Sequence, residues 1–309
     1  MNKLPILIKT IQDMELPYLR ISLSNRCNAD CSFCHNEGQK SKNDNIISSQ
    51  SYSEVAKLLT SHLAFPPRVV LTGGEPLLAD NLFEAIKVFK SYNYKVGLTT
   101  NSIALNENRQ KLLFETGLDT INISLNSLNK EKYKDFYRVD KLSVVKENLK
   151  TLNKYFKSPN KKINWIVTEK VDFDEEIPNL CKLSKEFKFI ISPLFDIEFD
   201  EKKVFQILDK LKVKLEFLHG KPNIRKTTEY KRHKEYLKYD DGNIIWEFDN
   251  LRTKENSFSM KDNNYCKNCP DNIKKTCFEG AYTLRLSADG TFRPCLERKD
   301  NNFKINEII

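Results

Sequence analysis

Short apolar runs alternate with amphipathic stretches along the first two thirds of the chain. The runs are rich in Ile, Val and Leu, as buried strands are, whereas the stretches between them repeat apolar residues at helical spacing. Strands that alternate with helices predict parallel βα units. Six strands are expected: Tyr18–Ser24, Arg68–Thr72, Tyr94–Thr100, Asp119–Leu125, Lys161–Val167 and Phe187–Ser192.

Helix signals lie between these strands. Residues Ser51–Glu54 form a Ser-x-x-Glu capping box that predicts a helix start, and Leu82–Phe89 and Arg109–Glu115 begin the next two helices. Six βα units are fewer than the eight that close a TIM barrel. The predicted fold class is therefore α/β, with a partial (β/α)6 barrel over residues 1–210.

The pattern changes after residue 196. A helix is predicted over Glu201–Leu211 and a hairpin at Asp240–Asn243. A second hairpin is predicted where Ala281–Ser287 and Thr291–Leu296 flank Asp289-Gly290, a preferred pair for a tight turn. We therefore expect a smaller C-terminal α+β domain over residues 211–309.

The composition is that of a folded chain, with 39% hydrophobic and 30% charged residues. No run approaches the roughly 18–20 apolar residues of a membrane span, and the N-terminus lacks a secretory cleavage site. Lys and Arg outnumber Asp and Glu by 51 to 42, but the lysines are scattered and form no basic stripe with interleaved aromatics. We expect a cytoplasmic protein without a membrane partner, and the pattern does not favour nucleic acid.

Seven of the eight cysteines fall into two clusters, and only Cys181 stands apart. Close cysteine clusters in a cytosolic chain indicate metal rather than disulfides. Cys27, Cys31 and Cys34 follow the first predicted strand as Cys-x3-Cys-x2-Cys. Three thiolates at this spacing can bind three irons of a [4Fe–4S] cluster and leave one iron open to a small ligand. A zinc site completed by His35 is the alternative.

The second cluster lies within 30 residues near the C-terminus. Four thiolates that a hairpin brings together can bind either a second [4Fe–4S] cluster or a tetrahedral zinc ion. The chemistry alone favours neither. The candidate ligands are Cys266, Cys269, Cys277 and Cys295.

Two motifs occur at the ends of successive predicted strands: Arg26–Cys34 reads RCNADCSFC and Thr72–Leu77 reads TGGEPL. In these motifs the sequence resembles the radical S-adenosylmethionine (SAM) superfamily. The resemblance implies an enzyme whose open iron binds SAM and whose glycine-rich motif contacts the SAM amino group. A glycine pair permits such close approach, and a proline stiffens the turn. The implied contacts are Gly73, Gly74, Glu75 and Pro76.

The resemblance extends over most of the chain to the GTP cyclase of molybdenum-cofactor synthesis, the MoaA type. Residues 98–101 and 117–128 are similar to its third and fourth strand motifs, which implies SAM contacts at Thr100, Ser124 and Asn126. Asn126 stands where this subfamily usually has Asp. The similarity of Leu284–Leu296 favours an auxiliary iron–sulfur cluster of the twitch or SPASM type, with three or four cysteine ligands.

The same resemblance implies basic residues at the site that holds triphosphate in the cyclase. The planar guanidinium group of arginine can donate two parallel hydrogen bonds to phosphate oxygens. Burying a cation without an anionic partner costs free energy. A small anionic substrate, such as a nucleotide, is therefore predicted; pairing with carboxylates such as Asp30 or Glu75 is the alternative. Thr283 in place of a second arginine, and the absence of a Gly-Gly tail after Glu307, favour a sister enzyme with a changed substrate. The basic residues are Arg20, Arg68, Lys162 and Arg285.

The predicted function is reductive cleavage of SAM to a 5′-deoxyadenosyl radical. The radical abstracts hydrogen from the substrate and drives cyclisation, rearrangement or oxidation, with flavodoxin or ferredoxin as electron donor. No catalytic side chain is identified. A peptide-modifying radical SAM maturase is the main alternative. A zinc-stabilised nucleic-acid-binding protein is a remote one, because the TGGEPL motif has no role in it.

Overall fold

The computed structural model describes residues 3–14, 18–34, 47–62, 68–169, 171–195, 201–229, 232–242, 244–249, 264–270, 283–295, 298 and 302–308. Its strands form one sheet in the order β12-β11-β10-β1-β2-β3-β4-β5-β6-β9-β8-β7. The strands are β1 (Tyr18–Ser22), β2 (Arg68–Thr72), β3 (Lys95–Thr100), β4 (Thr120–Ser124), β5 (Lys161–Val167), β6 (Ile190–Phe195), β7 (Asn223–Glu229), β8 (Arg232–Asp240), β9 (Ile245–Asp249), β10 (Thr283–Leu286), β11 (Thr291–Arg293) and β12 (Phe303–Lys304).

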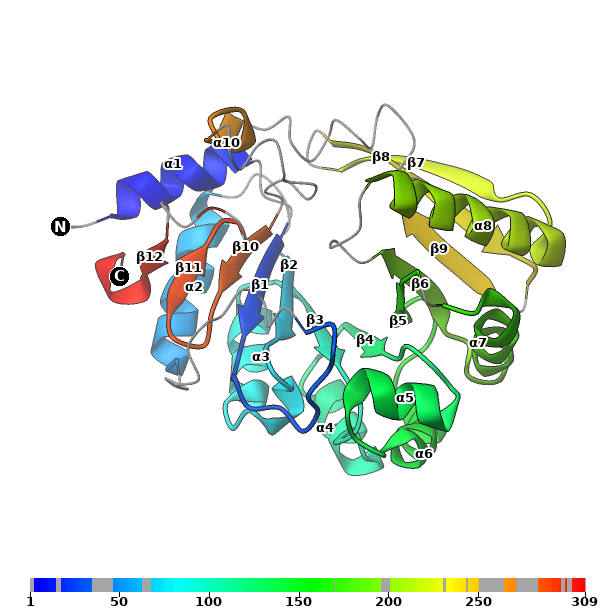
Figure 1. Ribbon diagram of the computed structural model, residues 1–309. Helices are drawn as coiled ribbons and strands as arrows, with labels where there is room; N and C mark the ends of the chain where they lie inside the picture. The colour runs from blue at the N-terminus through cyan, green and yellow to red at the C-terminus, as the bar shows by residue number, and fades with distance from the viewer. Residues whose placement is uncertain are drawn as a thin grey trace.

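Strands β1 to β6 are parallel neighbours, and the sheet curves without closing while helices cover its convex face (Figure 1). This confirms the predicted α/β class with a partial barrel. The helices are α1 (Leu4–Met14), α2 (Ser49–His62), α3 (Leu82–Ser91), α4 (Glu107–Glu115), α5 (Lys130–Tyr137), α6 (Leu142–Leu152), α7 (Phe173–Phe187), α8 (Glu201–His219) and α10 (Asn264–Lys267), with 3-10 turns η2 (Pro76–Leu78) and η3 (Ile305–Glu307).

Buried and half-buried side chains alternate along β5, so one face of the sheet packs in the core and the other faces inward. Every second residue of β5 is buried, and Trp165 packs edge-on against Phe173 of α7 at 6.0 Å. The residues between them, including Lys162 and Asn164, are half-buried and point to the opposite, concave face. Register places Asn164 beside Ser124 of β4. The polar positions of neighbouring strands therefore share the concave face.

The C-terminal segment contributes to both edges of the barrel. Strand β10 pairs in parallel with β1 and continues antiparallel into β11 and β12, whereas β9 pairs in parallel with β6 and continues into β8 and β7. The expected boundary between residues 210 and 211 falls inside α8. Because elements from both sides of it share one sheet, the division into two domains stays a prediction.

Most predicted elements lie within a few residues of the observed ones, and both hairpins are confirmed, with Gly290 at φ 72° in the turn between β10 and β11. The prediction that Ser51–Glu54 forms the capping box of this helix is wrong. The hydroxyl of Ser48 instead accepts a hydrogen bond from the Ser51 amide at 3.1 Å, so α2 begins at Ser49. No helix in the described ranges is long and apolar enough to cross a membrane.

Candidate functional site

The cysteine loop that follows β1 contacts the glycine loop that follows β2 through the backbone. The amide of Gly74 donates to the Ser24 carbonyl at 2.7 Å, and the amide of Glu75 donates to the Arg26 carbonyl at 2.7 Å. A Cβ on Gly74 would lie 2.3 Å from the Arg26 carbonyl oxygen, so no side chain fits there. The glycine pair thus brings the two predicted motifs into direct contact.

Glu75 joins the ends of β2 and β3. Its carboxylate, in a side chain only 1% exposed, accepts hydrogen bonds from the Thr100 hydroxyl at 2.6 Å and the Asn101 amide at 2.8 Å. The Leu77 amide is a third donor, at 3.1 Å. Burial raises the pKa of Glu75 to about 6, against the lowering effect of these hydrogen bonds. Two predicted SAM residues, Glu75 and Thr100, are therefore fixed by each other.

Asn101 extends this contact to the first cysteine and was not predicted as a site residue. Its side-chain amide donates to the Asn28 side chain at 2.8 Å and lies 3.9 Å from the Cys27 sulfur. The available signal was its place at the end of the third strand, within the Leu98–Asn101 motif. The residue connects the β3 end to the cysteine loop.

The three cysteines of the loop are free thiols, with Cys27 and Cys34 exposed and Cys31 half-buried. Burial raises the pKa of Cys27, and burial together with the two neighbouring thiols raises the pKa of Cys31 to about 12. Such groups give up their protons when a metal binds. In the described part of the chain, no three His, Cys, Asp or Glu side chains converge on one ion. The three thiolates fit an iron–sulfur cube, which offers each of them its own iron. His35, the predicted alternative ligand, lies outside the described residues.

Helix α5 supports the cysteine loop from the side. The amides of Asp30 and Ser32 donate to the carbonyls of Tyr137 and Phe136, at 3.1 and 2.9 Å. The Phe33 ring packs edge-on against the Tyr137 ring at 5.8 Å. The last turn of α5 therefore holds the cysteine loop in place.

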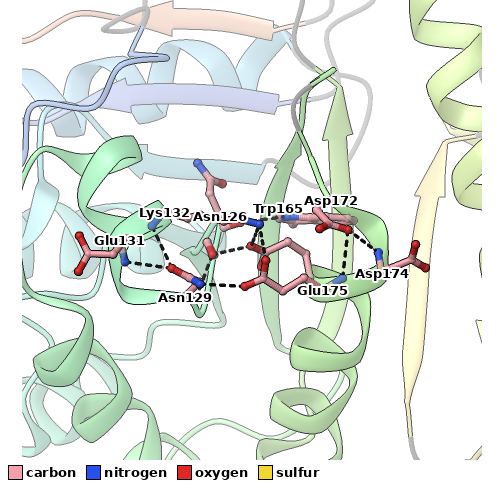
Figure 2. Close-up of polar contacts among 10 residues, drawn as sticks. Asn126, Asn129, Glu131, Lys132, Trp165, Asp172, Asp174 and Glu175 are labelled. Atoms are coloured by element: carbon pink, nitrogen blue, oxygen red, sulfur yellow. Dashed lines mark hydrogen bonds and ion pairs between the residues drawn. The ribbon is translucent and has the colours of Figure 1, made fainter.

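The turn after β4 carries the other predicted SAM residues. Ser124 is half-buried at the strand end. Asn126 is 2% exposed; its side-chain oxygen accepts from the Ile166 amide at 3.1 Å, and its backbone carbonyl accepts from the Trp165 indole at 3.2 Å (Figure 2). The side-chain NH2 of Asn126 is buried and has no hydrogen-bond partner within the described ranges. It is a donor available to a ligand.

A polar network that the sequence did not predict anchors this turn to α7 (Figure 2). The Ser127 hydroxyl donates to Glu176 at 2.6 Å, and the Asn129 side chain donates to Glu175 at 2.9 Å. Lys132 pairs with Glu175. Burial raises the pKa of Glu176, which is 2% exposed. The network connects residues more than forty positions apart in sequence.

The predicted substrate residues are only partly brought together. Arg20 of β1 and Arg285 of β10 are register partners on adjacent strands. Lys162 pairs with Glu247 of β9, at 3.0 Å between charged atoms. Arg68 is exposed at the first residue of β2, the strand end opposite the glycine loop. The predicted alternative partners are engaged elsewhere, since Asp30 pairs with Arg138.

Three cysteines of the second cluster lie in described residues, and Cys277 lies outside them. Cys266 belongs to α10, and the Cys269 amide donates to its carbonyl at 3.0 Å. Cys295 is buried beyond β11. Arg298 lies over the Tyr265 ring at 4.3 Å and donates to the Tyr265 carbonyl at 3.1 Å, which ties α10 to the segment after Cys295.

Comparison with known proteins adds a family and a set of relatives. A family model described as "Radical SAM superfamily" matches residues 21–184. A "Probable GTP 3′,8-cyclase" of Pyrococcus horikoshii is 31% identical over 291 residues, which cover 92% of this chain and 84% of the relative. The protein of the same name from Sulfolobus acidocaldarius is 30% identical, over 98% of this chain and 88% of its own.

Solved structures share the fold. Streptococcus suis SuiB bound to S-adenosylmethionine superposes with a TM-score of 0.65 at 14% identity, over 98% of this chain and 66% of that chain. A native anSMEcpe structure with bound AdoMet gives a TM-score of 0.58 at 18% identity, over 91% of this chain and 74% of that chain.

Proposed function

Because the chain belongs to the radical SAM superfamily, we propose that Cys27, Cys31 and Cys34 hold the [4Fe–4S] cluster that binds SAM. With both cofactors bound, the site supplies a 5′-deoxyadenosyl radical that abstracts a hydrogen atom from the substrate. The observation that supports this assignment best is the direct backbone contact between the cysteine loop and the glycine loop. That contact holds three thiols beside the loop that approaches SAM in this family.

We assign a task to five of the seven predicted SAM residues. Gly73 and Gly74 keep the two loops in contact, while Glu75 holds the ends of β2 and β3 together through Thr100. Asn126 offers a buried NH2 donor beside Ser124. Fixed donors of this kind orient a ligand without reorganisation when it binds.

The substrate we propose is a small anion, with GTP as the first candidate. The relatives at about 30% identity carry the name GTP 3′,8-cyclase. Arg20 and Arg285 are adjacent in register, which suits an oxyanion better than two isolated cations do. For the second cluster we propose Cys266, Cys269 and Cys295, with Cys277 as a fourth candidate ligand, and for the electron donor a flavodoxin or ferredoxin.

The test is release of 5′-deoxyadenosine by the reconstituted, reduced full-length protein with SAM, without oxygen. We expect GTP to stimulate release strongly, and Cys31→Ala to abolish it. Cys181→Ala is the matched control, because Cys181 lies on α7, away from both cysteine clusters. Full iron content and activity in Cys31→Ala would contradict the cluster assignment.

The identity of the substrate is tested separately from the assignment of the cluster ligands. If 5′-deoxyadenosine is released at the same rate with and without GTP, the substrate is not this nucleotide, and the search moves to other anions or to peptides. With GTP active, Arg285→Ala should raise the KM for GTP at least tenfold, as expected for the loss of a charged hydrogen bond worth about 1.5–3 kcal/mol. Arg68→Ala, at the far end of β2, should leave the KM unchanged.

A further inference from the structure

Three arginines form a row across the neighbouring strands β1, β10 and β11. Arg20 of β1 is the register partner of Arg285 of β10, and Arg285 is in turn the register partner of Arg293 of β11. Figure 1 shows these strands side by side toward one edge of the sheet. Register partners on neighbouring strands point to the same face of a sheet. Arg293 was not predicted as a site residue, yet it shares the row of two residues that were.

The row lies on the concave face of the sheet. The residues that alternate with the arginines on β10 and β11 belong to the apolar core and are 0% exposed: Leu284, Leu286 and Phe292. The register that starts at Arg20 and crosses β2, β3 and β4 leads to the face that carries Lys162 on β5. Because side chains alternate between the two faces of a strand, the three arginines point into the barrel.

Two buried hydroxyls lie on the same face as the row. Thr283 precedes Arg285 by two positions, and Thr291 precedes Arg293 by two, so each threonine shares the face of its arginine. Strands β10 and β11 are antiparallel, which places one threonine on each side of the row. Thr283 and Thr291 are 0% and 5% exposed, and neither hydroxyl has a hydrogen-bond partner in the part of the chain that the structure describes. Buried polar atoms are nearly always hydrogen-bonded, so these two hydroxyls indicate a ligand.

The guanidinium group of Arg293 is held by a single described hydrogen bond. Its Nε donates to the hydroxyl of Ser287 at 2.9 Å, and Ser287 is 2% exposed. No carboxylate of the described ranges forms an ion pair with Arg293. Its two terminal NH2 groups can therefore donate parallel hydrogen bonds to the oxygen atoms of an anion. Like charges on directly opposite residues destabilise a sheet, and an anion bound along the row would offset that cost.

We propose that Arg293 is a third arginine of the substrate site and that it binds the phosphate-bearing end of the substrate together with the hydroxyls of Thr283 and Thr291. The inference rests on the proposal that the substrate is a small anion. Arg293 supplies from β11 a positive charge that Thr283 does not supply from β10. The length of the row suits a group with several negative charges better than a single carboxylate.

The test is calorimetric titration of the reconstituted full-length protein with inorganic triphosphate, which carries the phosphate charges without a nucleoside. The variants are Arg293→Gln and Thr291→Val, the second of which keeps the side-chain shape and removes the hydroxyl. Arg109→Gln is the matched control. Arg109 also donates one hydrogen bond, to the Ala104 carbonyl at 3.1 Å, but it lies on α4 at the convex face.

We expect Arg293→Gln to raise the Kd for triphosphate at least about tenfold, the factor that corresponds to the loss of one charged hydrogen bond. Thr291→Val should raise it about threefold, as expected for a neutral hydrogen bond. Thr291→Val should also unfold at the wild-type urea concentration when no triphosphate is present, because its hydroxyl has no partner to lose. Arg109→Gln should bind triphosphate as the wild type does.

Equal affinity of the wild type and Arg293→Gln for triphosphate overturns the proposal, and so does a wild type that does not bind it. If Arg293→Gln does not fold, Arg293→Lys decides by the same titration. Lysine keeps the charge and cannot donate two parallel hydrogen bonds, so its Kd should still rise about threefold. The titration needs neither SAM nor a reduced cluster. A protein that binds triphosphate through Arg293 but releases no more 5′-deoxyadenosine with GTP would therefore contradict GTP as the substrate and support the anion site.

Discussion

At Gly74 two loops meet without room for a side chain. Gly74→Ala should destabilise the protein by about 1–3 kcal/mol, the usual cost of overpacking, because the new methyl group would press on the Arg26 carbonyl. It should also lower the iron content, since the cysteine loop must move. Urea unfolding and iron analysis measure both effects.

Gly220→Ala is the control for Gly74→Ala. Gly220 has a φ of +76°, but a methyl group added there would meet nothing within 4 Å, so this substitution strains the backbone without a clash. We expect wild-type iron content there. Wild-type stability and iron in Gly74→Ala would show that the loops separate freely.

A buried carboxylate at Glu176 gives the protein a specific pH response. Its pKa in the folded state is raised from 4.5, mainly by burial. Folding therefore favours the protonated form of Glu176. The stability that this group contributes is present below pH 4.5 and is lost as the pH rises through its higher pKa in the folded state. Glu176→Gln keeps the shape and cannot ionise.

We expect the difference in unfolding free energy, Glu176→Gln minus wild type, to become more positive as the pH rises above 4.5. Urea unfolding of both proteins between pH 4.5 and 8 measures it. A difference that stays flat across this range would mean that Glu176 ionises as easily folded as unfolded.

Caps at the ends of two helices help to hold the site in place. Asn129 caps α5 by accepting hydrogen bonds from the amides of Glu131 and Lys132, and Asn106 caps α4 in the same way through Arg109. Either Asn→Ala change should cost about 1 kcal/mol of stability. Of these two helices, α5 is the one that supports the cysteine loop, so Asn129→Ala should weaken SAM binding and Asn106→Ala should not.

Titration of the reconstituted variants with SAM, followed by the change in the EPR spectrum of the cluster, separates these two effects. Asn106→Ala should match the wild-type affinity for SAM despite its lower stability. Equal SAM affinity in all three proteins would show that α5 is not needed to position the loop.

The elements were predictable where local patterns determine them. Strands such as Arg68–Thr72 and Lys161–Val167 have the predicted bounds because their apolar runs end at polar turns. The capping residue of α2 was not predicted, since Ser48 and Ser51 offer the same hydroxyl and only the tertiary position of the helix selects one. The hydrogen bond between Ser127 and Glu176 and the ring contact between Phe33 and Tyr137 join residues that are distant in sequence, and a linear pattern carries no signal for such contacts.

One sheet contains strands from both predicted domains. Residues 1–210 alone would lack β10, whose buried Leu284 and Leu286 lie beside β1, and they would also lack β9 beside β6. We therefore expect this fragment to show no cooperative unfolding transition, whereas the full-length chain shows one. A cooperative transition in the fragment, seen by circular dichroism on heating, would support an independently folding barrel.

The pairing of β1 with β10 joins residues near the two ends of the chain, Tyr18 with Thr283 for example. A ribosome adds roughly 5–20 residues per second, so the first strand waits on the order of 13 to 50 seconds before its neighbour has been synthesised. During that time one edge of β1 is open to other nascent chains. The protein should therefore depend on holding chaperones during synthesis, and co-expression of such a chaperone should increase the folded yield.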